Sequence, residues 1–280
     1  ITQMLPDTAT GLIAIELGAN GPNFAVTAAC ATGGAAAGEA AEIIARGEAE
    51  VVITGGFEAP LRPIFYAGFN AMRALAHHDD PTKAARPFDA ERNGFVVAEG
   101  AGVMVMESLE HAQQRGAEIY GEWKGAASSS DAVDMVAAAD DGRGVAVAMR
   151  KALKRANLET SEIDYINAHG PGTPLGDRVE SFAIRKVFGE DADNLMVSST
   201  KSMIGHMMGA SGAIEAMVAL LATKHGVVPP TINYANPDPD CDLDYVPNEA
   251  READVRYAMS TSVGLGGHNS AIIFGRWEGE

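Results

Sequence analysis

The 280-residue sequence predicts a layered α/β fold, and three patterns support this prediction. Short β-type runs alternate along the chain with helical segments that are rich in small residues. Glycine-rich turns close several of these runs. Hydrophobic residues make up 46% of the sequence, which is enough for a chain of this length to bury a large core. We therefore expect either one large domain or two fused halves.

The first series of elements lies in the N-terminal third of the chain. Residues 23–27 form a β-type run, and residues 33–46, mostly alanine, glycine and glutamate, predict a helix. Residues 50–54 predict a buried strand that a Gly-Gly pair closes. Residues 94–106 predict two strands around a glycine turn.

A second series begins near residue 119. Helices are predicted over residues 144–156 and 177–187, and a third helix begins near His206 and is ended by a Pro-Pro pair. The two series predict two halves of similar topology. The strands predicted in the second series are residues 164–167, 195–198, 257–261 and 270–274.

Charge and composition exclude several classes of function. A net charge of −17 and a pI of about 4.7 argue against binding to nucleic acid or to anionic lipid, since both attract a positive surface. The most apolar run, residues 210–223, is too short for a membrane span and is interrupted by Glu215. The two cysteines, Cys30 and Cys241, suggest no disulfide framework and suit a reducing compartment. The chain begins with Ile1 and no signal-peptide pattern follows, so either a segment was removed or the sequence is a fragment. We expect a cytoplasmic location.

Cys30 is the first candidate for catalysis. It lies between a β-type run and a helix of small residues, in the sequence Ala-Ala-Cys-Ala-Thr-Gly-Gly. A helix N-terminus stabilises negative charge, so we expect a lowered pKa for this thiol and a role as a nucleophile. The alternative is a buried structural cysteine, and the local residues alone leave both interpretations open.

His169 and His206 are candidate partners for this thiol. His169 follows a strand and precedes a Gly-Pro-Gly turn, where the active-site loops of open α/β sheets gather. His206 lies at the start of a helix, whose N-terminus would lower the pKa of the ring and keep it neutral. A neutral imidazole can donate an N–H to a developing oxyanion. Taken singly, each histidine is more simply interpreted as structural, and neither an HExxH motif nor a CxxC pair supports a metal site.

Lys201 and Glu215 form a predicted pair of charges. Glu215 is the only charge in an apolar stretch, so a buried carboxylate there needs a partner, and Lys201 is our candidate. Lys201 could instead orient His206, and a solvent-facing Glu215 is an equally simple interpretation.

An ordered set of motifs over essentially the whole chain resembles the β-ketoacyl-carrier-protein synthases, the condensing enzymes of the thiolase superfamily. The similarity is greatest to the elongating synthases of type II fatty-acid synthesis. Members of that family carry a further N-terminal stretch, so the resemblance implies that this sequence is roughly the C-terminal two-thirds of such an enzyme. The motifs are Arg86-Pro-Phe-Asp89, Gly94-Phe-Val-Val-Ala-Glu-Gly100, Asn167-Ala-His-Gly170, Thr200-Lys-Ser-Met-Ile-Gly-His206, Val228-Pro-Pro-Thr-Ile-Asn233 and Cys241-Asp-Leu-Asp-Tyr-Val-Pro247.

The resemblance implies a thiolase-like αβαβα fold of two similar halves. The N-terminal half, residues 1–117, would be incomplete, and residues 118–280 would form the C-terminal half. The implied activity is that of an acyltransferase, a 3-oxoacyl-[acyl-carrier-protein] synthase that joins an acyl-cysteine to malonyl carrier by decarboxylative Claisen condensation. The implied partners are acyl carrier protein and a second copy in a homodimer. No cofactor is implied beyond the phosphopantetheine that carries the substrates.

The resemblance also implies roles for individual residues. Cys30 would accept the acyl group, and His169 and His206 would assist decarboxylation and stabilise the enolate. Lys201 would support the His206 loop and pair with Glu215. The other implied contacts are an oxyanion hole of the backbone N–H groups of Cys30 and Leu265, and pantetheine or substrate contacts from Thr173, Gly266 and Gly267.

Three places depart from the family pattern. Pro171 and Gly172 replace the Thr-Ser that usually follows His-Gly, which removes one expected pantetheine contact. Leu265 occupies a gating position that is commonly Phe, so the chain-length preference is expected to differ. The loop of residues 75–81 lacks an arginine that relatives often direct toward the acidic carrier, so docking would fall to neighbouring histidines or other basic residues.

Three alternatives stay open. The catalytic ketosynthase subunit of a type II polyketide or polyene pathway shares every catalytic residue. A non-catalytic partner of the chain-length-factor type is disfavoured, because such subunits usually lack the nucleophile that Cys30 provides. The third alternative is an inactive fragment that lacks part of its core.

Overall fold

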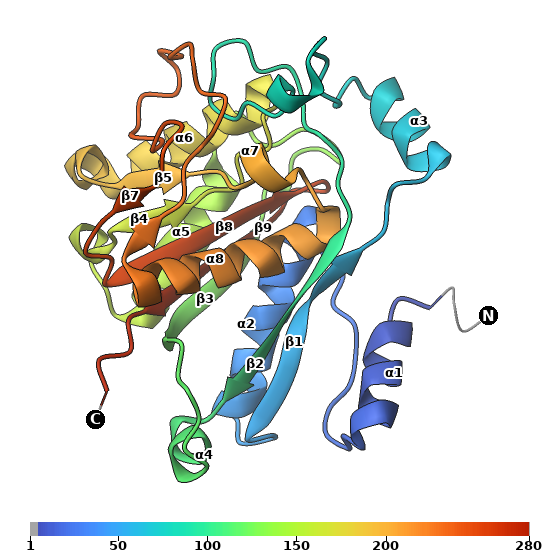
Figure 1. Ribbon diagram of the computed structural model, residues 1–280, viewed down its shortest axis with the longest axis vertical. Coiled ribbons are helices and arrows are strands. Elements are labelled where there is room, and N and C mark those ends of the chain that lie inside the picture. Colours follow the sequence, from blue (N-terminus) through green and yellow to red (C-terminus); the bar gives the residue numbers. More distant parts are fainter. Residues whose placement is uncertain (1–4, 280) are drawn as a thin grey trace.

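The computed structural model describes residues 5–279, whose helices and strands stack in layers (Figure 1). The larger sheet has five strands. β4, β5 and β8 run parallel to one another, and β9 runs antiparallel to both of its neighbours. In order across the sheet the strands are β3 (Glu122–Ser130), β9 (His268–Gly275), β8 (Tyr257–Gly264), β4 (Tyr165–Asn167) and β5 (Met196–Ser198).

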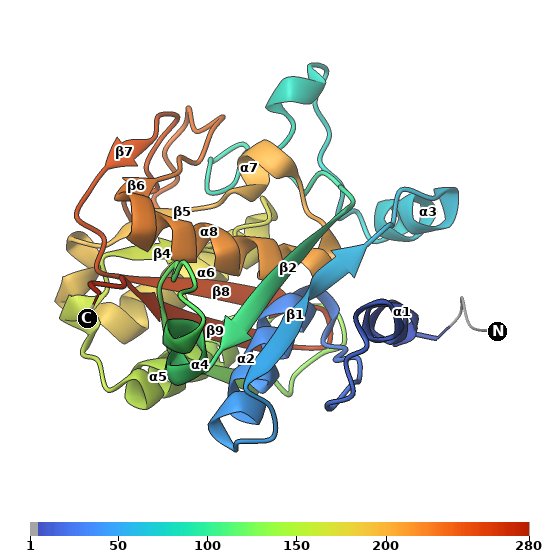
Figure 2. The same cartoon turned by 60° about the horizontal axis from the view of Figure 1, so that its bottom comes forward.

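Helices cover both faces of this sheet (Figure 2). α5 (Arg143–Ala156) and α6 (Pro174–Phe188) lie on one face, and α2 (Thr32–Ala45) and α8 (Ser211–His225) lie on the other. A second sheet, of antiparallel β1 (Val51–Glu58) and β2 (Gly100–Glu107), packs on the far side of α2 and α8. The order of layers is therefore a small sheet, a helical layer, the large sheet and a second helical layer, which confirms the predicted α/β class.

Peripheral elements complete the described chain. α1 (Thr8–Leu17) and α3 (Pro63–Ala71) contain no buried residue, and both project from the layered body (Figure 1). None of the helices within residues 5–279 combines the length and the hydropathy that a membrane span requires. The remaining elements are α4 (Leu109–Gln114), α7 (Lys201–Ile204), β6 (Val227–Val228), β7 (Arg251–Glu252) and the short 3₁₀ helices η2 (Ala29–Ala31), η3 (Pro81–Lys83), η4 (Thr160–Glu162), η5 (Gly189–Asp193) and η6 (Met208–Ala210).

Glycines at the crossing of α2 and α8 let these two helices approach closely. A Cβ atom on Gly33 would collide with the backbone nitrogen of Ala213. A Cβ atom on Gly212 would lie 2.9 Å from the backbone nitrogen of Gly34, closer than real side chains pack. The two helix backbones are therefore in direct contact at this point.

The same local structure precedes both of these helices. η2 leads into α2 and η6 leads into α8, and the first residue of each, Ala29 and Met208, has a φ of +47°. Such a conformation is uncommon for a residue with a side chain and is held by the surrounding packing. η2 carries Cys30, and η6 closely follows His206, so the helix crossing places these two segments side by side.

Most of the predicted elements are confirmed. The helices predicted over residues 33–46, 144–156 and 177–187 correspond to α2, α5 and α6. The four strands predicted in the second series correspond to β4, β5, β8 and β9. These segments carry strong hydrophobic periodicity, because each buries one or both faces in the core.

Several local predictions are wrong. Residues 23–27 form no strand, because no other segment of the described chain pairs with them. β1 continues through the Gly-Gly pair, since both glycines pair with β2, and only one of its residues is buried. Residues 94–98 form isolated bridges to Leu75 and His206, so β2 is the single regular strand in residues 94–106.

The helix predicted to begin near His206 also differs from the prediction. α8 begins at Ser211 and ends at His225, where Gly226 takes the left-handed conformation of a helix C-cap. The helix therefore stops before the Pro-Pro pair, which lies beyond β6. His206 lies in the loop that precedes the helix.

Gly33→Ala should destabilise the fold. The added methyl group meets the α8 backbone, which cannot move aside without opening the helix crossing, so the free energy of unfolding should fall by about 3 kcal/mol. Gly38→Ala in the same helix is the matched control, because its methyl group would meet only the Ala126 side chain at 3.6 Å. This control should gain about 0.5–1 kcal/mol from helix propensity. Urea unfolding measures both, and equal stabilities of the two variants would contradict the close crossing.

Candidate active site

Cys30 lies in η2 with 8% of its surface exposed. The apolar side chains of Phe95, Val97 and Met208 form a buried cluster with the thiol. The end of β8 also packs against this turn, since a Cβ atom on Gly264 would lie 3.0 Å from the Cys30 nitrogen. The nucleophile candidate therefore lies where α2, the η6 segment and the large sheet meet.

Burial raises the pKa of the Cys30 thiol to about 11. The Lys201 charge and backbone hydrogen bonds from Leu265 and Cys30 act in the opposite direction, because they stabilise a thiolate. The prediction of a lowered pKa is therefore wrong. Removal of the sulfur from water outweighs the effect of the helix N-terminus, so Cys30 is a neutral thiol at physiological pH.

The two candidate histidines lie side by side. Their ring centroids are 5.3 Å apart, and the rings are nearly perpendicular at 83°. The His206 ring also makes an edge contact with Phe95, at 5.2 Å, and Phe95 belongs to the Cys30 cluster. The backbone N–H of His206 donates a hydrogen bond to the Val96 carbonyl at 2.7 Å, which fixes the loop that carries the ring. The structure thus brings Cys30, His169 and His206 together from three distant segments.

Both rings are neutral at physiological pH. Burial, followed by the nearby Lys201 charge, lowers the pKa of His169 and of His206 well below the usual value of 6.5. The predicted protonation state is therefore confirmed, but its cause differs from the one predicted. α8 begins only at Ser211, so His206 lies outside the helix. Desolvation and the Lys201 charge, and not the helix N-terminus, lower the pKa of its ring.

The Ser211 hydroxyl orients the His206 ring. Its oxygen accepts the Met207 N–H at 2.9 Å and lies 3.0 Å from His206 Nδ1. When the hydroxyl donates its own proton to Nδ1, the ring carries its proton on Nε2. Nε2 is then a hydrogen-bond donor.

Lys201 and Glu215 form the predicted charged pair, and both side chains are buried. Lys201 Nζ also donates a hydrogen bond to the carbonyl of His169 at 2.6 Å. Burial raises the pKa of Glu215 to about 7, and Lys201 opposes this shift. The side-chain bonds of Lys201 therefore join the His169 loop to α8, whereas the resemblance implied support for the His206 loop.

Glu180, on α6, is a buried carboxylate that the sequence interpretation missed. It accepts the N–H groups of His169 at 2.9 Å and Gly170 at 2.7 Å, and the Thr261 hydroxyl donates to it at 2.7 Å. Burial raises the pKa of Glu180, while these hydrogen bonds lower it. Glu180 therefore accepts the backbone N–H of His169, and Lys201 donates to its backbone carbonyl.

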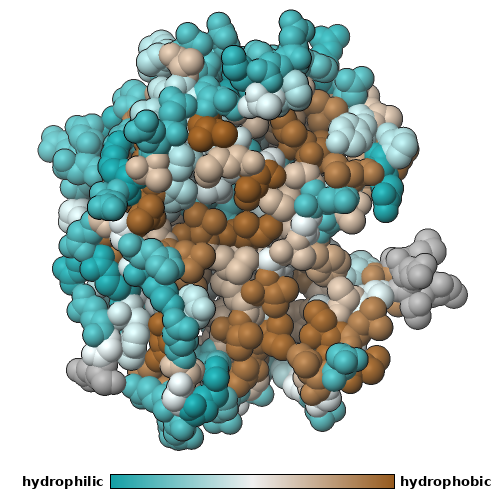
Figure 3. Space-filling view, viewed as in Figure 1, coloured by the Kyte–Doolittle hydropathy of each residue, from teal (hydrophilic) through white to brown (hydrophobic). Residues whose placement is uncertain are grey.

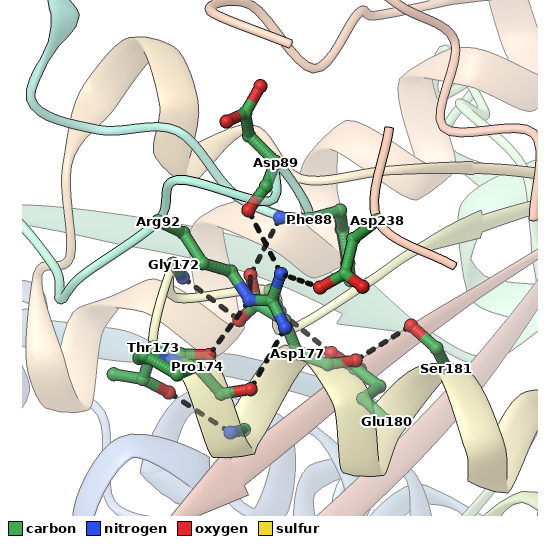
Figure 4. A network of polar contacts seen from close by, with 12 residues as sticks. Phe88, Asp89, Arg92, Gly172, Thr173, Pro174, Asp177, Glu180, Ser181 and Asp238 are labelled. Atoms are coloured by element: carbon green, nitrogen blue, oxygen red, sulfur yellow. Dashed lines mark hydrogen bonds and ion pairs between the residues drawn. The ribbon is translucent and has the colours of Figure 1, made fainter. Parts of the chain in front are cut away.

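A second missed carboxylate, Asp177, ties the same loop to the segment that begins with the Arg-Pro-Phe-Asp motif (Figure 4). Asp177 accepts the Phe88 N–H at 2.7 Å and the Gly172 N–H at 3.0 Å. Arg92 lies 3.7 Å from Asp177 and donates to Asp238 at 2.5 Å. Burial raises the pKa of Asp177 to about 7 against the opposing effects of these backbone N–H groups and Arg92.

The remaining predicted residues lie around this centre. Leu265 directs its N–H toward the Cys30 sulfur, and its side chain is 37% exposed. Gly266 and Gly267 form the turn between β8 and β9, with φ values of +81° and +73° that favour glycine. Thr173 caps α6, because its hydroxyl oxygen accepts the N–H of the third residue of the helix at 3.2 Å. Within residues 5–279, no group of three or more His, Cys, Asp or Glu side chains is arranged to hold a metal ion.

Comparison with known proteins identifies the family. Residues 1–112 match the family described as "Beta-ketoacyl synthase, N-terminal domain", and residues 120–235 match "Beta-ketoacyl synthase, C-terminal domain". The 3-oxoacyl-[acyl-carrier-protein] synthase 2 of Staphylococcus aureus is 51% identical over 99% of this chain and 67% of its own length. The chain belongs to the β-ketoacyl synthase family.

Other relatives of this ketosynthase agree with the match. The 3-oxoacyl-[acyl-carrier-protein] synthase 2 of Synechocystis is 48% identical over 99% of the chain and 67% of its own length. A β-ketoacyl synthase structure from Burkholderia phymatum is 38% identical, with a TM-score of 0.94, over 99% of this chain and 67% of that one. One solved structure is a type II polyketide acyl-carrier protein in complex with its ketosynthase. Its matching chain is 40% identical, with a TM-score of 0.95, over 97% of this chain and 67% of that one. The fold is thus thiolase-like, and the chain spans about two thirds of these relatives' length.

The positions of Asp177 and Glu180 carried a signal in the sequence. Both acids lie in the first turns of the helix that follows the His169 loop, where a carboxylate can turn back toward backbone N–H groups. The motif that contains Phe88 carried no such signal, because its contact with Asp177 joins residues that are 89 positions apart.

The two neutral histidines predict a loss of stability in acid. The unfolded state binds a proton near pH 6.5 and the folded His206 ring does not, so the free energy of unfolding falls as the pH decreases below 6.5. One such ring lowers the free energy of unfolding by about 1.4 kcal/mol when the pH falls from 7.5 to 5.5. His206→Asn should therefore lose about 1.4 kcal/mol less than the wild type over this interval in urea unfolding.

The matched control is His225→Asn, since His225 is exposed to water at the end of α8. This variant should lose as much stability as the wild type. Equal losses for the wild type and His206→Asn would contradict the lowered pKa.

Proposed function

We propose that this chain catalyses the decarboxylative Claisen condensation of an acyl-cysteine enzyme with malonyl carrier protein in fatty-acid chain elongation. The observation that carries the proposal is the juxtaposition of a buried thiol with two buried, neutral imidazoles. The 51% identity with a 3-oxoacyl-[acyl-carrier-protein] synthase 2 supports fatty-acid elongation as the pathway.

In the first step, Cys30 Sγ attacks the thioester carbonyl of an acyl carrier. The Sγ–C bond forms, the carrier's C–S bond breaks, and the thiol proton leaves with the carrier thiol. The backbone N–H groups of Cys30 and Leu265, which already converge on the sulfur, supply an oxyanion hole for the tetrahedral intermediate. Lys201 assists because its positive charge favours the thiolate.

In the second step, malonyl carrier loses carbon dioxide and leaves an enolate of the carrier thioester. The Nε2–H group of His206 and a ring N–H of His169 donate hydrogen bonds to the thioester oxygen as negative charge develops on it. The loss of one such donor typically costs about 10²–10³ in rate. The enolate carbon attacks the acyl carbonyl, the C–S bond to Cys30 breaks, and the Cys30 thiolate takes a proton from water.

The charged groups behind the histidines act as positioning residues. Lys201 and Glu180 fix the backbone of His169, and Glu215 balances the Lys201 charge within the protein. Burial and the Lys201 charge keep both rings neutral, while the hydrogen bonds of Lys201 and Glu180 meet the backbone of the His169 loop.

Acyl carrier protein is the proposed partner, and its phosphopantetheine thioester the proposed form of both substrates. A solved relative is a ketosynthase in complex with its acyl-carrier protein. We propose that Thr173, Gly266 and Gly267 contact the pantetheine arm or the substrate, for which the resemblance is the support. We also propose a homodimer and a cytoplasmic location, for which the resemblance is the support.

A polyketide ketosynthase is the second candidate. Two observations favour it: the 40% identity with a type II polyketide ketosynthase, and the aliphatic Leu265 in the turn beside Cys30. The higher identity with the fatty-acid relatives places fatty-acid elongation first.

Cys30→Ala should abolish acyl transfer and reduce condensation by about 10³-fold or more, because no other nucleophile replaces the sulfur. Intact mass after incubation with acyl carrier protein reports the acylation, and product analysis reports the condensation. Cys241→Ala is the matched control, since Cys241 is the other buried cysteine and lies in a separate core cluster. It should retain acylation, and acylation of Cys30→Ala at the wild-type rate would refute the assignment.

Leu265→Phe should change the acyl-chain selectivity, because a larger, planar side chain next to Cys30 restricts the space that an acyl group enters. The measurement is the ratio of kcat/KM values for carriers of short and long acyl chains. Leu265→Met conserves volume and should keep the wild-type profile. The same selectivity in wild type and Leu265→Phe would count against a gating role.

A further inference from the structure

Arg92 lies three residues after the Arg-Pro-Phe-Asp motif, and only 4% of its side chain is exposed. Its guanidinium joins the first residues of α6 to two other segments (Figure 4). Nε donates to the Thr173 carbonyl at 3.3 Å, and Nη2 donates to the Pro174 carbonyl at 2.9 Å. Nη1 donates to the Asp89 carbonyl at 2.9 Å and to the Asp238 carboxylate at 2.5 Å. All three nitrogens of one buried side chain therefore bind acceptors from three parts of the chain.

A cation at this position costs free energy in two ways. Burial removes the guanidinium from water. The N-terminus of a helix carries a partial positive charge, so the macrodipole of α6 disfavours a cation beside Thr173 and Pro174. The carboxylates of Asp177, which lies 3.7 Å from Nε, and Asp238 offset these costs. Beyond a balance of charge, the arrangement provides a fixed position for two backbone carbonyls, because the planar guanidinium donates in set directions.

The segment that carries Arg92, residues 88–98, also contacts the loop between His169 and α6. The Gly94 N–H donates to the Gly172 carbonyl at 2.9 Å. A Cβ atom on Gly172 would lie 2.8 Å from the Gly94 carbonyl oxygen, so the two backbones are in close contact. The 88–98 segment is therefore attached to this loop and, through Arg92, to the start of the helix that follows it.

The other end of the 88–98 segment holds the reactive centre. The Val96 carbonyl accepts the backbone N–H of His206 at 2.7 Å, and the Ala98 N–H donates to the His206 carbonyl at 2.9 Å. Two further apolar side chains of the segment belong to the buried cluster of Cys30. One stretch of chain thus connects the start of α6 with both Cys30 and His206.

We propose that Arg92 is a positioning residue for carrier-bound substrates. Its bonds to two carbonyls of α6 fix Thr173, and the 88–98 segment fixes Thr173 relative to the Cys30 thiol. The inference rests on the proposed function, in which Thr173 contacts the carrier-bound substrate. A substrate that is held by this contact while its thioester reacts at the centre requires a set distance between the two places.

Arg92→Lys keeps the positive charge but presents a single ammonium group in place of the planar fork, so it cannot hold both α6 carbonyls and Asp238 together. The contact that it disturbs is remote from the reacting bonds. We therefore expect KM for malonyl carrier to rise about tenfold, while kcat falls less than about threefold. Alkylation of Cys30 by iodoacetamide needs no carrier arm and should keep the wild-type rate.

Arg185→Lys is the matched control, because Arg185 lies at the other end of α6 and makes a similar set of bonds. It donates to the Asp193 carboxylate at 2.5 Å, to the Asp242 carboxylate at 3.2 Å and to the Asp242 carbonyl at 3.0 Å. Loss of this fork should leave KM unchanged. Equal KM values for the wild type and Arg92→Lys, or equal increases in the two lysine variants, would overturn the proposal.

A double-mutant cycle tests whether Arg92 acts through Thr173. Thr173→Val removes the hydroxyl and should raise KM by itself. If Thr173 carries the effect of Arg92, adding Arg92→Lys to Thr173→Val should raise KM no further. An unchanged KM in Thr173→Val, or additive increases in the double variant, would overturn the proposal.

Asp238→Asn provides a milder change, in case circular dichroism shows that Arg92→Lys does not fold. The amide keeps an acceptor oxygen for Arg92 but removes the charge that helps to hold the guanidinium. KM for malonyl carrier should rise about threefold with little change in kcat. A wild-type KM in Asp238→Asn would then count against the positioning role.

Amide hydrogen exchange separates this inference from the proposed function. The Gly176 N–H donates to the Thr173 hydroxyl at 3.2 Å and should exchange about tenfold faster in Arg92→Lys than in the wild type. The Gly170 N–H, which donates to Glu180 at 2.7 Å, should exchange at the same rate in both. Equal exchange of Gly176 in both proteins would overturn the proposal. A wild type that forms neither acyl enzyme nor product would refute the proposed function, and the exchange of Gly176 would still decide whether Arg92 fixes the start of α6.

Discussion

The close crossing of α2 and α8 is the constraint on which the site depends. The two helix backbones touch at Gly33 and Gly212, and neither position has room for a side chain. Each helix is preceded by a single turn, one of which carries Cys30 while the other follows His206. If the helices were a methyl group further apart, the thiol and the imidazole would separate by a comparable distance. Catalysis by positioned groups tolerates little displacement of this kind.

Buried charge supports this geometry at a considerable cost in desolvation. Three buried carboxylates, Glu180, Asp177 and Glu215, surround the His169 loop, and burial raises the pKa of each. Hydrogen bonds from backbone N–H groups and the cations of Lys201 and Arg92 offset that cost. As a result, the backbone of the His169 loop is held on both sides. The His169 ring stays neutral, as expected for a donor to an oxyanion.

The two parts of the chain differ in how completely they cover their apolar surface. The five-stranded sheet has helices on both faces, and its strands β8, β9 and β4 are almost entirely buried. The two-stranded sheet packs on α2 and α8 and exposes the side chains of Val51, Ile53 and Phe57. Apolar side chains gather on this side of the molecule, around β1 and α1 (Figure 3). The Cys30 turn lies at the junction of these parts, since Thr27, Thr32 and Gly209 line the same groove as β1.

The sequence by itself determined the layered class, the order of most helices and strands, and the identity of Cys30, His169, His206, Lys201 and Glu215 as candidates. Periodicity and turn residues are local properties, so a local pattern suffices to predict them. The tertiary structure alone decided the protonation of Cys30, because burial is a property of everything packed around the sulfur. It also decided the contact of Asp177 with the Phe88 backbone. Contacts between distant segments leave no periodic trace in the sequence, and for that reason only the folded chain reveals them.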